Sequence, residues 1–202
     1  MIKYVPQMTS VVLEEIPDRV SLAVEISNCQ GSCVGCHSPF LRDDIGSELT
    51  PALIDSLIAD NFGVDCFLFL GEGKDAAALL ALAGHIRKTH PSLALALYSG
   101  REQVETEIWE AFDYVKVGPY LPECGPLNER STNQRLYRLS HGTDGMPDAA
   151  PGHPRRAKGR AVSHKGNPIP ALPGRKSASG IPANAEDITA RFWRKGIEGI
   201  QK

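Results

Sequence analysis

The first 140 residues carry a hydrophobic pattern that alternates between strand-like and helix-like segments. Residues 20–27 alternate by two. Residues 64–70, apolar apart from Asp65, and residues 93–98 are typical of strands buried on both faces. Thr50 and Pro51 suit the N-cap and the first position of a helix. The predicted strands are 11–16, 20–27, 64–70, 93–98 and 114–117, and the predicted helices are 50–60, 76–88 and 102–112.

This alternation predicts an α/β fold built from parallel β/α units. A closed eight-fold β/α barrel usually takes about 250 residues. The patterned region is much shorter, so we expect a partial, open β/α barrel. Folds of this kind place their active sites at the carboxyl ends of the strands.

Composition divides the 202 residues into three segments. Residues 1–140 form the patterned domain. Residues 141–184 hold seven Gly, seven Pro and seven Lys or Arg against two Asp, which predicts a flexible, low-complexity basic insertion. A basic interaction arm is the alternative. In residues 185–202, apolar side chains recur at spacings of three and four, so we expect a C-terminal helix docking on the core.

Charge and cysteine content narrow the class of protein. The net charge of −2 excludes a generally basic nucleic-acid binder as the default interpretation. The longest uncharged run of small apolar residues, 76–84, is far shorter than the ~20 residues of a membrane span. We expect no secretory signal, and five cysteines favour a reducing compartment over a disulfide framework. A cytoplasmic protein without a membrane or nucleic-acid partner is predicted.

Three cysteines, Cys29, Cys33 and Cys36, follow a predicted strand with the spacing C-x3-C-x2-C. Gly31 and Gly35 allow the short backbone to wrap tightly around a metal centre. Iron–sulfur clusters usually take four cysteines, so three close thiols leave one metal corner open. The fourth ligand could also come from elsewhere in the chain.

Other interpretations of the cysteines stay open. A structural zinc site would use the same three thiols with His37, although adjacent Cys36 and His37 are awkward partners in one tetrahedron. His37 could instead donate a hydrogen bond to a cluster sulfur or lie on the surface. Cys66 falls in an apolar run and is interpreted as a small core residue. Cys124, in a Pro/Gly loop, is interpreted either as a surface thiol or as a group that contacts the metal ligands without binding the metal.

The cysteine motif resembles the signature of the radical S-adenosylmethionine (SAM) enzymes. The wider stretch 29–40, ending Cys-His-Ser-Pro-Phe, is similar to the activating proteins of anaerobic (class III) ribonucleotide reductase. Gly35 precedes the third cysteine, as in this subfamily, where many superfamily members have an aromatic residue. The long 141–184 segment is the main departure. The resemblance extends to segments 115–120, 125–128, 132–137, 187–189 and 192–195.

The resemblance implies a radical SAM type of partial barrel and a set of cofactor contacts. Cys29, Cys33 and Cys36 would hold a [4Fe–4S] cluster. Gly71 and Glu72 stand where the family binds the SAM amino group, although Leu70 replaces the family's first glycine. Ser99 and Gly100 would contact the SAM carboxylate or ribose, and Gly118 would lie near the adenine. The alternative for each position is an ordinary turn or helix cap, with Tyr120 packed on the core.

The implied activity is the generation of a glycyl radical on another protein. The family cleaves SAM to methionine and a 5′-deoxyadenosyl radical, which removes hydrogen from a glycine Cα of the large subunit of anaerobic ribonucleotide reductase. A flavodoxin-like protein would supply the electron. Two alternatives are a radical SAM enzyme for a small molecule or another glycyl radical enzyme, and a zinc-stabilised binding module with a basic arm.

Overall fold

The computed structural model describes residues 1–31, 33–141 and 180–193. The helices are α1 (Pro51–Asp60), α2 (Ala76–Thr89) and α3 (Thr106–Ala111), with 3₁₀ helices η1 (Pro6–Met8), η2 (Pro39–Arg42) and η3 (Thr189–Phe192). The strands are β1 (Lys3–Tyr4), β2 (Ser10–Val12), β3 (Ser21–Glu25), β4 (Ser47–Glu48), β5 (Cys66–Leu70), β6 (Ala94–Tyr98), β7 (Tyr114–Val117), β8 (Arg135–Leu139) and β9 (Ala185–Asp187).

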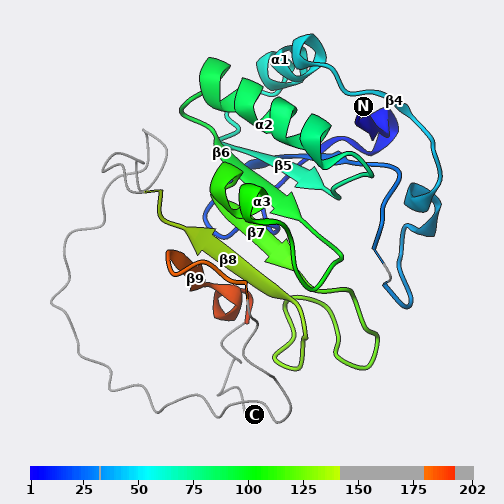
Figure 1. The fold of residues 1–202 in the computed structure, drawn as a ribbon, viewed down its shortest axis with the longest axis vertical. Coiled ribbons are helices and arrows are strands. Elements are labelled where there is room, and N and C mark those ends of the chain that lie inside the picture. Colours follow the sequence, from blue (N-terminus) through cyan, green and yellow to red (C-terminus); the bar gives the residue numbers. More distant parts are fainter. Residues whose placement is uncertain (32, 142–179, 194–202) are drawn as a thin grey trace, which may run out of the picture.

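A seven-stranded mixed sheet forms the centre of the molecule, in the order β2-β3-β5-β6-β7-β8-β9 (Figure 1). Strands β3, β5, β6 and β7 run parallel, and β2, β8 and β9 add antiparallel pairs at the sides. The predicted α/β class is therefore confirmed. Over residues 1–31, 33–141 and 180–193 the sheet is open, because no ladder joins β2 to β9.

The three α-helices cover one face of the sheet (Figure 1). Helix α1 begins at Thr50, whose hydroxyl accepts a bond from Leu53 N–H at 3.3 Å, as predicted for this N-cap. Helix α2 begins at Asp75, whose carboxylate accepts from Ala78 N–H at 3.0 Å. The helices and the facing strand residues form the larger core, whose fully buried members include Ile54, Leu79, Ile86, Phe67, Phe69 and Leu97. This packing fixes where each parallel strand ends.

Two segments from opposite ends of the described chain cover the other face. Ile16, between β2 and β3, is fully buried there, and Ile188, just before η3, is nearly so. Both pack against the smaller residues of the central strands in a second core. Arg191 of η3 also forms an ion pair with Asp18. The open sheet is therefore covered on both faces.

Several predicted elements are shorter or different in the structure. The predicted strand 11–16 stops at Val12, because the following residues turn over the sheet and bury Ile16. The predicted helix 102–112 is shorter in the structure, where α3 spans Thr106–Ala111. The residues before Thr106 form the connection from β6. Strands β8 and β9 were not predicted, and they pair antiparallel rather than through a helical crossover.

Most of the predicted insertion 141–184 lies outside the described residues, as do residues 194–202 of the predicted C-terminal helix. Within 185–193, strand β9 and η3 replace the expected helix. Two hydrogen bonds join the residue before the predicted insertion to its last residue. Ser140 N–H donates to Asn184 O at 3.1 Å, and Asn184 Nδ2 donates to Ser140 O at 3.0 Å. The segment therefore starts and finishes at neighbouring points of the sheet.

None of the helices in the described part of the chain has both the length and the apolar character needed to cross a bilayer.

Candidate functional site

The cysteine loop, residues 29–41, leaves the carboxyl end of β3 and returns to the same place. Cys29 N–H donates to Leu41 O at 2.9 Å, and Asn28 N–H donates to Asp43 O at 3.2 Å. Asn28 adopts a left-handed φ of 58°, which asparagine tolerates better than most residues. These features close the loop at its base and hold it beside the strand ends.

Two of the three predicted metal ligands lie close together. A Cβ built on Gly31 would lie 3.3 Å from Cys29 Sγ and 3.8 Å from Cys33 Sγ. Cys36 is half-buried on the same loop. Among residues 1–31, 33–141 and 180–193, however, no three Cys, His, Asp or Glu side chains are arranged as a metal site. The sulfurs of Cys29 and Cys33 therefore both lie beside Gly31, while the three cysteines do not converge as a metal site.

Gly100, just after β6, lies against Cys33 and Gly31 of the cysteine loop. A Cβ added there would lie 3.2 Å from Gly31 Cα and 3.3 Å from Cys33 Sγ, tighter than ordinary van der Waals contact. Tyr120 N–H, just after β7, donates to Cys33 Sγ at 3.3 Å. Cys33 thus contacts the chain at the carboxyl ends of two central strands. The sequence placed Gly100 near a cofactor, but it did not predict this contact with the cysteine loop.

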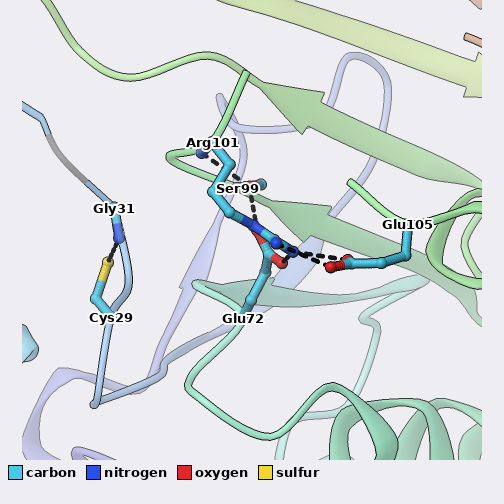
Figure 2. A network of polar contacts seen from close by, with 6 residues as sticks. All are labelled: Cys29, Gly31, Glu72, Ser99, Arg101 and Glu105. Carbon is cyan, nitrogen blue, oxygen red and sulfur yellow. Dashed lines mark hydrogen bonds and ion pairs between the residues drawn. The ribbon is translucent and has the colours of Figure 1, made fainter. Parts of the chain in front are cut away.

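A polar network joins the ends of β5 and β6 beside the loop (Figure 2). Arg101 pairs with Glu72, and its Nη2 lies 2.8 Å from Oε2 of Glu105. Ser99 Oγ donates to Glu72 and accepts from Arg101 N–H at 3.0 Å. Hydrogen bonds to Glu105 and Glu72 hold the pKa of Arg101 above its ordinary value. Glu72, predicted to face a ligand ammonium, thus binds a guanidinium here.

Gly71 and Gly118 tie the same strand ends together through their backbones. Gly71 N–H donates to Tyr98 O at 3.0 Å, and Gly118 N–H donates to Arg101 O at 2.6 Å. Both glycines have positive φ, of 117° and 103°, where a side chain would be strained. A Cβ at Gly118 would also lie 3.1 Å from Gln134 Cα. All five predicted SAM-contact residues therefore lie at or just beyond the carboxyl ends of β5, β6 and β7.

Lys116 is a residue of this region to which the sequence assigned no role. It lies on β7, is 7% exposed, and donates from Nζ to Gly118 O at 2.8 Å and to Ser99 O at 3.3 Å. Burial lowers the pKa of Lys116 to about 8, against nearby Cys33, Glu15 and Cys29, which raise it. A lysine inside the apolar strand Tyr-Val-Lys-Val was the available signal, because lysine is rarely buried without a partner.

The other cysteines and His37 occupy distinct environments. Cys66 on β5 is fully buried, and burial raises the pKa of its thiol to about 12, so its prediction as a core residue is confirmed. Cys124 is half-buried in the turn after β7, and its carbonyl accepts from Ser131 Oγ at 2.8 Å. His37 is exposed on the cysteine loop.

The donor set suits a thiolate-bound iron–sulfur group. The loop offers three thiols that are neither buried nor paired in disulfides. Soft thiolates are the protein ligands of iron–sulfur clusters and also bind zinc. Gly31 and Gly100 leave backbone, rather than side chains, against the sulfurs of Cys29 and Cys33. The two glycines thus form a backbone cradle beside the sulfurs, and the three thiols are the donors that fit an iron–sulfur group.

No protein-family model, curated protein or solved structure matches this chain. The interpretation of the site therefore depends on its own residues and their arrangement. The features that carry it are the spacing of the three cysteines and the contact of their loop with the ends of the parallel strands.

Proposed function

We propose that this chain is a radical SAM activating enzyme that generates a glycyl radical on anaerobic ribonucleotide reductase in the cytoplasm. The open sheet would be a partial barrel of the radical SAM type. In this proposal, Cys29, Cys33 and Cys36 hold a [4Fe–4S] cluster, and metal binding draws Cys36 to the other two thiols. Metal sites often complete their geometry only when the metal binds.

One observation carries the proposal: the C-x3-C-x2-C loop lies against the carboxyl ends of the central parallel strands. Gly100 after β6 and Tyr120 after β7 both approach Cys33. Parallel β/α folds bind ligands at this edge. A structural zinc knuckle would not require its thiols to face the ligand-binding edge of a sheet.

Residues at the strand ends would bind SAM next to the cluster. Gly71 and Glu72 would hold its ammonium, Ser99 and Gly100 its carboxylate or ribose, and Gly118 would lie near the adenine. Glu72 now pairs with Arg101, but it can bind an ammonium instead, because Arg101 would still be paired with Glu105 at 2.8 Å. A bound, reduced cluster would supply the one electron that splits SAM into methionine and a 5′-deoxyadenosyl radical, and hydrogen transfer from the glycine Cα would then give 5′-deoxyadenosine and the glycyl radical.

The protein substrate in this proposal is the large subunit of the anaerobic reductase. A flavodoxin-like protein would donate the electron. In this proposal, a glycine-bearing loop of the folded partner would reach the strand ends where the cysteine loop lies. Residues on the strand ends would position SAM and exclude water around it.

Anaerobic reconstitution tests this function. The full chain, loaded with iron and sulfide, is expected to show a [4Fe–4S] signal and to cleave SAM under reductant. Mixed with the candidate reductase, it should give a glycyl radical in electron paramagnetic resonance (EPR) spectra. Cys29→Ala, Cys33→Ala and Cys36→Ala should each abolish cleavage. Cys124→Ala is the matched control, since it removes a half-buried thiol outside the loop.

Each alternative predicts a different result. One zinc and no iron in anaerobic material would replace the proposal with a zinc-stabilised binding module. SAM cleavage without a radical on the reductase would point to another glycyl radical enzyme or a small molecule as substrate. Full activity in all three cysteine variants would reject the ligand assignment.

A further inference from the structure

Lys116 lies on the face of the sheet opposite the α-helices, beside the cysteine loop. Strand register pairs it with Tyr98 of β6, and its Nζ lies 5.8 Å from the centre of the Tyr98 ring. Two carbonyls at the strand ends, Ser99 O and Gly118 O, accept hydrogen bonds from Nζ. The ammonium is therefore held at the carboxyl ends of β6 and β7, where Cys33 also lies.

No carboxylate of the described residues forms an ion pair with Lys116. Its two hydrogen-bond acceptors are neutral carbonyls, and an ammonium has three donors. Burial lowers the pKa of Lys116, and the nearby side chains of Cys33, Glu15 and Cys29 raise it. Glu15 is the carboxylate among these three side chains, and no direct ion pair joins it to Lys116 in the described part of the chain. Burying a cation without a close counter-charge is costly, which indicates that an anionic group completes this site.

Two backbone N–H groups also stabilise negative charge on the sulfurs of Cys29 and Cys33. Gly31 N–H donates to Cys29 Sγ at 3.3 Å, and Tyr120 N–H donates to Cys33 Sγ at 3.3 Å. Positive charge and N–H donors near the ligand sulfurs stabilise negative charge on an iron–sulfur group. The reduced form carries one more negative charge than the oxidised form, so it gains more from a fixed cation nearby.

We infer that Lys116 is the buried counter-charge of the Cys29 and Cys33 thiolates, and that it raises the reduction potential of the cluster that they hold. This inference rests on the proposed function, because it requires a redox-active group on the cysteine loop. Lys116 acts through the two cysteines and contacts no reacting atom, so it is a positioning residue. A flavodoxin-like donor could then reduce the cluster more readily.

The experiment is an EPR-monitored redox titration of the reconstituted full chain. Lys116→Gln removes the charge but keeps a donor for Gly118 O. At the wild-type midpoint, the ratio of reduced to oxidised cluster should fall about tenfold, which equals a shift of about 59 mV to lower potential for a one-electron couple. Lys116→Arg should retain the wild-type midpoint. Lys88→Met, exposed on α2, is the control for loss of a distant positive charge.

Circular dichroism and iron content establish that each variant is folded and loaded. If Lys116→Gln does not fold, Lys116→Met is titrated in its place. An unchanged midpoint in a loaded neutral variant overturns the inference and leaves the proposed function intact. A wild-type chain that takes up no iron overturns both. A Lys116-dependent midpoint in a chain that does not cleave SAM supports the inference and rejects the activity.

Discussion

Glycine at position 100 gives the cysteine loop room to lie against β6. The space that a Cβ would occupy is bounded by Gly31 Cα at 3.2 Å and Cys33 Sγ at 3.3 Å. Gly31 Cα is backbone, so the loop itself would have to shift by a few tenths of an ångström. The position of Cys33 therefore depends on the absence of a side chain at a residue distant in sequence.

Gly100→Ala is expected to weaken iron binding while leaving the fold intact. The added methyl group displaces the loop by a few tenths of an ångström, and such changes beside metal ligands typically cost about 10–100-fold in affinity. Iron content in competition with a chelator measures the effect. Gly84→Ala is the matched control, because nothing lies within 4 Å of its Cβ position. Wild-type iron affinity in Gly100→Ala would contradict the assigned cradle.

Glu25, the last residue of β3, makes stability depend on pH. Burial and the nearby Glu15 raise its pKa from 4.5 to about 7. The unfolded chain loses this proton near the lower value and the folded chain near the higher one. The free energy of unfolding should therefore fall as the pH rises through this window, and level off above pH 7.

Glu25→Gln removes the ionisable group, so its free energy of unfolding should exceed that of the wild type at pH 8. At pH 4 the two proteins should be equally stable. The side chain is partly exposed, so solvent screening reduces the expected gain to about 1 kcal/mol. Urea unfolding at the two pH values measures it. Glu110→Gln, on the exposed side of α3, makes the same change of charge as a control. An equal gain in both variants would show that net charge, rather than the Glu25 site, is responsible.

At the level of elements, the parallel order of β3, β5, β6 and β7 assembles the site. Each strand carries one part of it at its carboxyl end: the cysteine loop after β3, Glu72 after β5, Ser99 and Gly100 after β6, and Gly118 after β7. The helices fix these ends from one face. The segment between β2 and β3 supports them from the other, through fully buried Ile16.

Ile16→Ala should destabilise the protein by about 2–4 kcal/mol, because it removes a fully buried side chain and leaves a cavity over the second face. Denaturant unfolding measures the loss. Leu13→Ala, in the same segment but 68% exposed, should change stability by less than about 0.5 kcal/mol. Equal losses in the two variants would mean that the segment does not cover the sheet through Ile16.

At the level of the whole molecule, the described ends of the predicted insertion lie side by side. Two hydrogen bonds join Ser140 to Asn184, next to the paired strands β8 and β9. Only a short connection is needed between these points. The insertion predicted from composition, residues 141–184, stays a prediction, because residues 142–179 lie outside the described residues.

Replacing residues 142–179 with a four-residue Gly/Ser linker should leave the fold and iron binding unchanged. Each halving of a loop lowers its closure cost by about 0.6 kcal/mol, so a rise in stability of about 1–2 kcal/mol is expected. Thermal unfolding and iron content of the shortened chain test this. A loss of cooperative unfolding would show that the segment contributes to the core, and a loss of iron alone would connect it to the site.

Local patterns in the sequence were sufficient to predict the central elements of the sheet and its helices. Thr50 caps its helix as predicted, because the signals that start a helix lie within a few residues. The apolar runs became buried parallel strands, and Cys66 a core residue, because burial follows hydrophobicity. The spacing of Cys29, Cys33 and Cys36 is likewise local, and it was visible without any structure.

Contacts between distant segments were decided only by the tertiary structure. Strands β8 and β9 pair across the undescribed segment, the pairing of Arg101 with Glu72 depends on neighbouring strands, and Gly100 meets Cys33 only when β6 lies beside the cysteine loop. The burial of Lys116 is of the same kind, since one lysine in a short strand does not reveal which groups surround it. Periodicity reports which face of an element is buried, whereas the partners on that face depend on how the elements pack.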